Sequence, residues 1–310
     1  MRLRFFVLAI MATLLLVACE ERPSQTPEPR DHGFGLIKVE LEDLFWNRDY
    51  LYDDISHPDC DSDGVFLFPY GGQYYYHPVA IGYLVQKALS DYLLSNDPKY
   101  LDYAEKSVNA LAQRATRSNG GMYFPYNFDF PANGGQLVYT APWYSGMAQG
   151  VLLSCFSRLY YCTGDPKYEA WADSTFATFS DFKNDISTVY ITHNDQLSLG
   201  DGYYWVEEYP NPVRRFVLNG SIMGSFGLYD YWWVFGDLKA KQLFSMEMTS
   251  VLDHFPLYRN PGDISYYCLK FKRKDAYYHQ VHQWLLEQCC VYTGDTRFWV
   301  MSGILGADYH

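Results

Sequence analysis

The helical repeat of this chain is set by a short turn, Thr163-Gly164-Asp165-Pro166-Lys167-Tyr168, whose chemistry occurs four times along the chain. Gly164 suits the left-handed backbone that ends a helix, and Asp165 suits the capping position of the next helix, whose first residue is proline. The other three turns are Ser95-Asn96-Asp97-Pro98-Lys99-Tyr100, Phe235-Gly236-Asp237-Leu238-Lys239 and Thr293-Gly294-Asp295-Thr296-Arg297-Phe298. The chain therefore repeats a helix–turn–helix unit.

The segments before these turns, such as residues 79–94 and 143–162, carry apolar residues at helical spacing. We predict four helical hairpins whose first helices line the inside and whose second helices face outward. This is an all-α fold, an (α/α) toroid or barrel, and a two-layer solenoid is the alternative. The connections 120–142 and 188–212 are rich in Gly, Tyr and Pro with strand-like alternation, which predicts β-hairpins at one end of the toroid.

The first residues have the pattern of a bacterial lipoprotein signal peptide over residues 1–18. A basic start is followed by an apolar run, residues 5–17, that is too short for a membrane span. The run closes on Leu16-Val17-Ala18-Cys19, which resembles a lipobox with Cys19 as the lipidated residue. An ordinary cleaved signal peptide is the alternative. Residues 19–33 are polar and hold three prolines, which predicts a flexible tether before a catalytic domain at 34–310. We expect a lipid-anchored protein of the cell envelope, at the periplasmic face or the surface of the outer membrane.

The amino-acid composition limits the classes of molecule that the protein is expected to bind. A net charge of −12 argues against nucleic acid. Aromatic residues make up 19% of the chain, with 30 Tyr, and tyrosine serves both hydrophobic cores and sugar binding. Export permits disulfides, but four cysteines fall in apolar helical segments, where buried free thiols are at least as well suited: Cys155, Cys162, Cys289 and Cys290.

A cluster of polar and aromatic residues precedes each inner helix. The four clusters are residues 74–78, 142–145, 207–210 (leading to Asn219-Gly220) and 277–279. If the inner helices run parallel, all four clusters surround one mouth of the toroid. The sequence therefore predicts a shared active-site mouth there.

At these clusters the chain resembles the C-terminal catalytic domain of D-glucuronyl C5-epimerase. The matching pieces lie in order between residues 65 and 295 and are Trp143-Tyr144-Ser145 with Met147-Ala148-Gln149-Gly150, Glu207-Glu208-Tyr209-Pro210 with Phe216-Val217-Leu218-Asn219-Gly220, Gly227-Leu228-Tyr229-Asp230, Pro256-Leu257-Tyr258, Tyr267 with Leu269-Lys270, and Tyr278-His279 with His282. The resemblance implies an (α/α) barrel that converts D-glucuronate to L-iduronate within heparan- or heparosan-like chains. The family's N-terminal β domains are largely missing, which leaves chain-length preference and a homodimer as open questions.

The resemblance also implies site residues. The family's active-site acid falls on Glu208, and its tyrosines fall on Tyr209, Tyr267 and Tyr278. A carboxylate-binding arginine of the family stands here as Lys270, and lysine offers only a point charge. The residues expected to bind substrate are Lys270, Trp143, Tyr144, Asn219, His279, His282, Arg214 and Arg215.

Epimerisation at C5 removes a weakly acidic proton beside a carboxylate and returns one to the opposite face. The carboxylate must be neutralised by a cation or by strong donors, and two acid/base groups must face the carbon. We expect Tyr278 or Glu208 as one group and Tyr267 or Tyr209 as the other. If the resemblance is left aside, the Glu207-Glu208 pair can be interpreted as part of a solvent-exposed turn, and the tyrosines can be interpreted as residues of the hydrophobic core.

No cofactor is required for this chemistry. Asp59, Asp61 and Asp63 match the start of a calcium loop, but its twelfth position is Tyr70 and not glutamate. A structural calcium is therefore kept only as a candidate. His279 and His282 share a helix face without a third metal ligand in the sequence, which favours hydrogen bonding.

Three alternatives remain open from the sequence. A polysaccharide lyase begins with the same proton abstraction on a uronic-acid polymer. A glycoside hydrolase needs two opposed carboxylates, and Glu208 with Asp230 or Asp201 is a weak pair. A non-catalytic, surface glycan-binding lipoprotein is the third. In each case the expected partner is an anionic uronic-acid polysaccharide or oligosaccharide.

Overall fold

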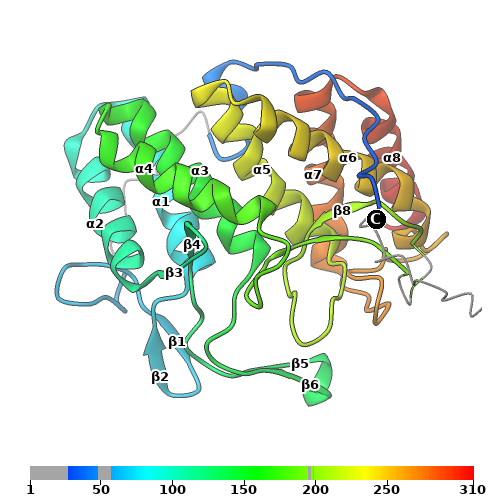
Figure 1. Ribbon diagram of the computed structural model, residues 1–310, viewed down its shortest axis with the longest axis horizontal. Helices are drawn as coiled ribbons and strands as arrows, with labels where there is room; N and C mark the ends of the chain where they lie inside the picture. Colours follow the sequence, from blue (N-terminus) through cyan, green and yellow to red (C-terminus); the bar gives the residue numbers. More distant parts are fainter. Residues whose placement is uncertain (1–26, 48–56, 195–196, 198) are drawn as a thin grey trace, which may run out of the picture.

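The structure is a computed structural model that describes residues 27–47, 57–194, 197 and 199–310. Its eight described α-helices pair into four hairpins: α1 (Pro78–Ser95) with α2 (Pro98–Arg114), α3 (Gly146–Thr163) with α4 (Pro166–Phe176), α5 (Leu218–Phe235) with α6 (Leu238–Tyr258), and α7 (Ala276–Thr293) with α8 (Thr296–Asp308). Figure 1 shows the hairpins following one another across the molecule. The predicted all-α (α/α) toroid architecture is confirmed.

The four turns have the predicted chemistry. The first helix of each hairpin ends at a residue in the left-handed region, namely Asn96, Gly164, Gly236 or Gly294. In each turn the next aspartate accepts a hydrogen bond from a backbone N–H of the following helix; these aspartates are Asp97, Asp165, Asp237 and Asp295. Local capping chemistry thus sets where each hairpin reverses.

The first helix of each hairpin is the inner one. α3 packs against both α1 and α5, and α5 packs against α7, whereas α2, α4, α6 and α8 pack mainly on their own partners. The inner helices α3 and α5 are buried almost throughout. The inner helices therefore form the curved wall on which the site is built.

The close approach of α3 and α5 requires glycine. A Cβ at Gly150 would lie 1.9 Å from the backbone oxygen of Gly224, and a Cβ at Gly227 would lie 2.1 Å from the oxygen of Gly150. Any side chain at these positions would separate the two backbones. This contact explains why the Gly227-Leu228-Tyr229-Asp230 piece begins with glycine.

The strands form four two-stranded antiparallel hairpins: β1 (Phe68–Tyr70) with β2 (Gln73–Tyr75), β3 (Thr116–Ser118) with β4 (Gly121–Tyr123), β5 (Phe130–Ala132) with β6 (Leu137–Tyr139), and β7 (Val189–Ile191) with β8 (Tyr204–Val206). Figure 1 shows β1–β2 and β5–β6 beside the ends where α1 and α3 begin. The predicted hairpins within 120–142 and 188–212 are present.

The amino-terminal segment from residue 27, dark blue in Figure 1, runs past α6 and α8 and over the helices. The backbone N–H of Arg30 donates to the oxygen of Gly202 at 2.7 Å, and that of His32 donates to the Thr249 hydroxyl at 2.9 Å. Residues 30 and 32, within the segment 19–33 predicted to be a tether, are therefore bound to the domain. Cys19 and the signal peptide lie outside the described residues.

Within the described chain, no helix has both the length and the apolar character needed to cross a membrane. The six described cysteines are free thiols, and Cys155, Cys268 and Cys289 are buried.

The side chains of Asp59, Asp61 and Asp63 do not converge, since no group of three or more His, Cys, Asp or Glu suited to a metal occurs in the described residues. The carboxylate of Asp61 instead accepts the N–H groups of Asp63 and Val65, so it organises its own loop.

Candidate active site

The four predicted clusters meet at one cavity of about 460 Å³. A volume of this size is within the usual range of ligand pockets. The described residues that line it are Phe45, Trp46, His77, Val79, Tyr83, Tyr126, Trp143, Ser145, Met147, Glu208, Tyr209, Asn219, Met223, Tyr277, Tyr278, Val281 and Trp284. Every inner helix or the residue just before it contributes to this wall.

Glu208 lies two residues after the end of β8, and hydrogen bonds hold the backbone of the two residues before it. The N–H of Val206 donates to the buried Glu247 carboxylate at 2.7 Å, and the N–H of Gly146, at the start of α3, donates to the oxygen of Glu207 at 2.9 Å. Glu207 points away from the cavity and accepts the N–H of Phe216 at 2.9 Å. Of the two adjacent glutamates, one therefore holds the loop and the other lines the cavity.

The carboxylate of Glu208 lies against the first turn of α5. A Cβ at Gly220 would lie 2.1 Å from Oε2 of Glu208 and 2.6 Å from its Cβ. Gly220 is therefore what allows the carboxylate to occupy this position. The partial positive charge of the helix N-terminus favours an anion there.

We expect Gly220→Ala to displace the Glu208 carboxylate and to lower turnover by about 10²-fold, because catalysis depends on sub-ångström placement. The matched control is Gly303→Ala on the exposed face of α8, where a Cβ would meet nothing within 4 Å. The control should keep full activity and gain about 0.5–1 kcal/mol of stability. Measurements of turnover and of chemical unfolding for both variants test this expectation. Equal activity in the two variants would contradict the claim that Gly220 positions the Glu208 carboxylate.

Three tyrosines surround Glu208. The Tyr267 hydroxyl donates to Oε2 of Glu208 at 3.4 Å, and the Tyr267 ring lies 4.6 Å from that of Tyr278. Tyr209 and Tyr278 line the cavity itself, whereas Tyr267 is 4% exposed and lies behind the wall. The structure thus brings together all four predicted catalytic residues, with Tyr267 in a supporting position.

The buried guanidinium of Arg215 lies behind these tyrosines. It is 4.8 Å from the ring centroid of Tyr209 and 5.6 Å from that of Tyr267. Burial raises the pKa of Glu208 to about 7, while hydrogen bonds from Tyr209 and Tyr267 and the charge of Arg215 oppose that rise. Burial also raises the pKa of Tyr278. Near neutral pH the carboxylate can exchange a proton while Tyr278 stays protonated.

The raised pKa of Glu208 predicts a pH-dependent stability. Its folded-state pKa is about 7 against an ordinary value of 4.5, so the folded state holds this proton more tightly, and stability falls as pH rises from about 4.5 to 7. We expect Glu208→Gln to be more stable than the wild type by about 3 kcal/mol at pH 8 and to lose this advantage near pH 4.5. Urea unfolding at both pH values measures the difference. An advantage independent of pH would contradict the assignment.

Several predicted binding residues lie elsewhere. Lys270 and Arg214 line a separate pocket of about 400 Å³, where the guanidinium of Arg214 lies 3.7 Å from the Tyr190 ring. The Tyr144 hydroxyl lies 2.8 Å from that of Thr116, and Tyr144 does not line the cavity. Trp143 and Asn219 do line it.

The two histidines of α7 are structural. Nδ1 of His282 and Nδ1 of His279 both lie 2.9 Å from the Ser265 hydroxyl, and Nε2 of His279 lies 3.0 Å from the oxygen of Leu305. Burial lowers the pKa of His282 to about 3. These residues join α7 to the loop before it and to α8, and neither reaches the cavity.

Sequence reasoning missed other members of the wall. His77 accepts the N–H of Ala80 through Nδ1 at 3.1 Å, and burial lowers its pKa to about 4. Its other ring nitrogen is therefore a neutral donor. His77 belongs to the cluster of residues 74–78, which the sequence pattern already placed at the mouth of the toroid. Nothing in the sequence marked Trp46 or Trp284, because both belong to the wall only through tertiary packing.

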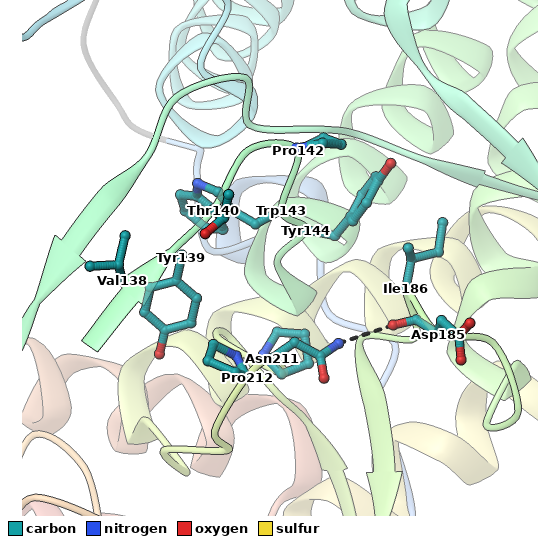
Figure 2. A pocket seen from close by; sticks show the side chains of 11 residues that line it. Val138, Tyr139, Thr140, Pro142, Trp143, Tyr144, Asp185, Ile186, Asn211 and Pro212 are labelled. Carbon is teal, nitrogen blue, oxygen red and sulfur yellow. Dashed lines mark hydrogen bonds between the residues drawn. The ribbon is translucent and has the colours of Figure 1, made fainter. Parts of the chain in front are cut away.

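Figure 2 shows a second pocket of about 310 Å³ beside the cavity, with Trp143 and Tyr139 on one side and Asn211 and Asp185 on the other. The Asn211 amide donates to the oxygen of Asp185 at 3.0 Å. Trp143 lines both hollows, so they adjoin at this side chain.

Residues 117–302 match the family described as D-glucuronyl C5-epimerase C-terminus. A D-glucuronyl C5-epimerase of Caenorhabditis elegans is 34% identical over 97 residues, which are 31% of this chain and 14% of that protein. An uncharacterised protein of Methanocaldococcus jannaschii is 26% identical over 214 residues, which are 67% of this chain and 61% of that protein. The chain thus spans less than two thirds of the length of either relative.

Solved structures share the fold. The cellobiose 2-epimerase of Spirochaeta thermophila superposes with a TM-score of 0.54 at 14% identity, covering 82% of this chain and 64% of that one. The cellobiose 2-epimerase of Bacillus thermoamylovorans gives a TM-score of 0.52 at 11% identity, covering 74% and 59%. At such low identity the likeness shows the architecture alone.

Proposed function

The chain belongs to the family of the D-glucuronyl C5-epimerase C-terminus, and from that premise we propose that it is a carbohydrate epimerase that inverts C5 of D-glucuronate units in a uronic-acid polysaccharide. One observation supports the finer assignment more than any other. Glu208, with a pKa of about 7, shares the cavity wall with Tyr209 and Tyr278. This set supplies a carboxylate base and phenol donors at one point.

The proposed step balances within these residues. The Glu208 carboxylate takes the C5 proton, and the electron pair passes into the uronate carboxyl group as an enolate. The Tyr278 hydroxyl then donates its proton to the opposite face of C5. A proton passing from the Glu208 carboxylic acid to the Tyr278 phenolate restores the resting state. Tyr267 contacts both groups and is well placed to assist that return.

The described cavity lining contains no Lys or Arg. The uronate carboxylate would therefore be held by neutral donors and not by the predicted Lys270. The neutral side chains available on the wall are those of His77, Ser145 and Asn219. Arg215 acts from behind Tyr209, where it offsets the developing negative charge. No cofactor is needed for this step.

The direct test is incubation of the protein with a panel of uronic-acid polymers in heavy water, followed by NMR of C5 deuterium. Incorporation into a polymer that keeps its length is the expected result. A folded protein that incorporates no deuterium into any polymer would refute the proposal.

A polysaccharide lyase uses the same abstraction and would release an ultraviolet-absorbing unsaturated end in the same experiment. A hydrolase is disfavoured because Glu208 is the single carboxylate among the described residues of the cavity wall. Asp201 accepts the N–H of Asn194 at 2.8 Å, and Asp230 is paired in the interior with Arg158. Neither faces Glu208 across the cavity.

We further propose that the protein is lipid-anchored to the bacterial cell envelope through Cys19. The lipobox-like Leu16-Val17-Ala18-Cys19 supports this. Labelled fatty acid should be incorporated by the wild type and not by Cys19→Ser. Equal labelling of both proteins would contradict the anchor.

A further inference from the structure

The cavity lining contains two chemically distinct groups of side chains. The first group comprises the acid, the tyrosines and the neutral donors described above. The second group comprises Phe45, Trp46, Tyr83, Val281 and Trp284. The indole of Trp46 lies 4.7 Å from the Tyr83 ring. This second group offers aromatic faces and no ionised side chain.

Part of this second group lies along one face of α7. Tyr277, Val281 and Trp284 are four and three residues apart, so they lie on the same side of the helix. From Tyr278 to Trp284 the helix rises about 9 Å, which is more than the span of one sugar ring. Trp284 is 57% exposed and Tyr277 is 65% exposed. Large aromatic side chains are therefore open to solvent along the face of α7 that lines the cavity.

Trp46 reaches this wall because the amino-terminal segment is bound to the inner helices. The N–H of Ile37 donates to the oxygen of Tyr292 at 2.9 Å, and the N–H of Phe45 donates to the Tyr292 hydroxyl at 2.9 Å. The indole N–H of Trp233 donates to the oxygen of Val39 at 2.8 Å. These contacts fix the backbone next to Trp46, which lies outside the residues matched to the family.

We propose that Trp46 and Trp284 form a second sugar subsite, which binds an uncharged pyranose unit beside the reacting uronate. The inference rests on the proposed function for the identity of the reacting unit. Pyranose rings carry apolar C–H faces that pack on aromatic rings, and tryptophan offers the largest such face. The described cavity lining has no Lys or Arg to pair with a second uronate carboxylate, which favours a neutral unit over a second uronate. The protein would thus bind an internal stretch of polymer and not a single sugar.

The experiment measures binding by calorimetry with two probes, the single uronate unit methyl glucuronide and a heparosan hexasaccharide. Trp284→Ala and Trp46→Ala should each weaken binding of the hexasaccharide by about tenfold and change binding of methyl glucuronide by less than about twofold. The matched control is Trp299→Ala, because Trp299 is 59% exposed on α8 and lines none of the described pockets. It should bind both probes as the wild type does.

Trp46→Ala could weaken binding merely by loosening the amino-terminal segment. Trp284→Ala avoids this ambiguity, because Trp284 is an exposed side chain of a long helix and its loss should leave the fold intact. Wild-type binding of the hexasaccharide by Trp284→Ala would overturn the proposal. Equal weakening of both probes would also overturn it, because the tryptophans would then hold the reacting unit. If hexasaccharide binding depends on Trp284 but no polymer exchanges its C5 proton, the subsite stands and the epimerase assignment fails.

Discussion

Glu208→Gln is expected to lower C5 hydrogen exchange by about a thousandfold, the middle of the range for a positioned acid or base. Glutamine keeps the shape of the side chain and a hydrogen-bond acceptor for the Tyr267 hydroxyl, which lies 3.4 Å from Oε2. It cannot accept the C5 proton. Initial rates of deuterium incorporation measure the loss, and near-ultraviolet circular dichroism shows that the fold is kept.

Tyr278→Phe is the companion change, and its control is Tyr266→Phe. Tyr266 sits near the site in the sequence, but its hydroxyl bonds to Oδ1 of Asn260 at 3.4 Å, outside the cavity. We expect a loss of about 10²-fold for Tyr278→Phe and none for Tyr266→Phe. If Glu208→Gln and Tyr278→Phe retain full exchange, neither residue is an acid or base in the reaction. A non-catalytic glycan-binding protein would show oligosaccharide binding with no exchange in the wild type.

Arg158→Met is expected to cost about 3–5 kcal/mol of unfolding free energy, because it leaves a buried carboxylate without its counter-charge. Arg158 on α3 and Asp230 on α5 are 3% and 2% exposed. Nε and Nη2 of Arg158 both lie 2.9 Å from Oδ2 of Asp230. Arg158 also donates to Oδ1 of Asn47 at 3.1 Å, which joins this pair to the amino-terminal segment.

The double change Arg158→Met with Asp230→Leu removes both charges together. A buried ion pair replaced by apolar side chains is often close to neutral, so the double variant should recover most of the stability lost in the single one. Urea unfolding of the wild type, both single variants and the double variant forms the cycle. A loss below about 1 kcal/mol for Arg158→Met would show that Asp230 is stabilised by other groups.

The ion pair also explains a piece of sequence that the family resemblance alone could not interpret. In Gly227-Leu228-Tyr229-Asp230, Gly227 permits the contact with α3, and the Tyr229 hydroxyl donates to the oxygen of Ile37. Asp230 binds Arg158. This motif therefore builds the wall of the toroid, although its acid could have been read as a catalytic partner of Glu208.

The four hairpins, and the mouth at which their inner helices begin, could be predicted from local sequence patterns. Asp165 and Gly164 act on backbone groups within a few residues, so their effect is readable without knowledge of the rest of the chain. The placement of residues 207–210 and 277–278 just before inner helices also followed from chain order. These local interactions explain why Glu208, Tyr209 and Tyr278 could be foreseen at one cavity.

The side chains that complete that cavity depend on tertiary packing. Lys270 lines another pocket together with Arg214, while Arg215 lies behind Tyr209. Trp46, far from the site in the sequence, is carried to the wall by hydrogen bonds to α5 and α7. The physical reason is that helix rotation and the path of long connections are set by packing between distant segments, which no local pattern of residues records.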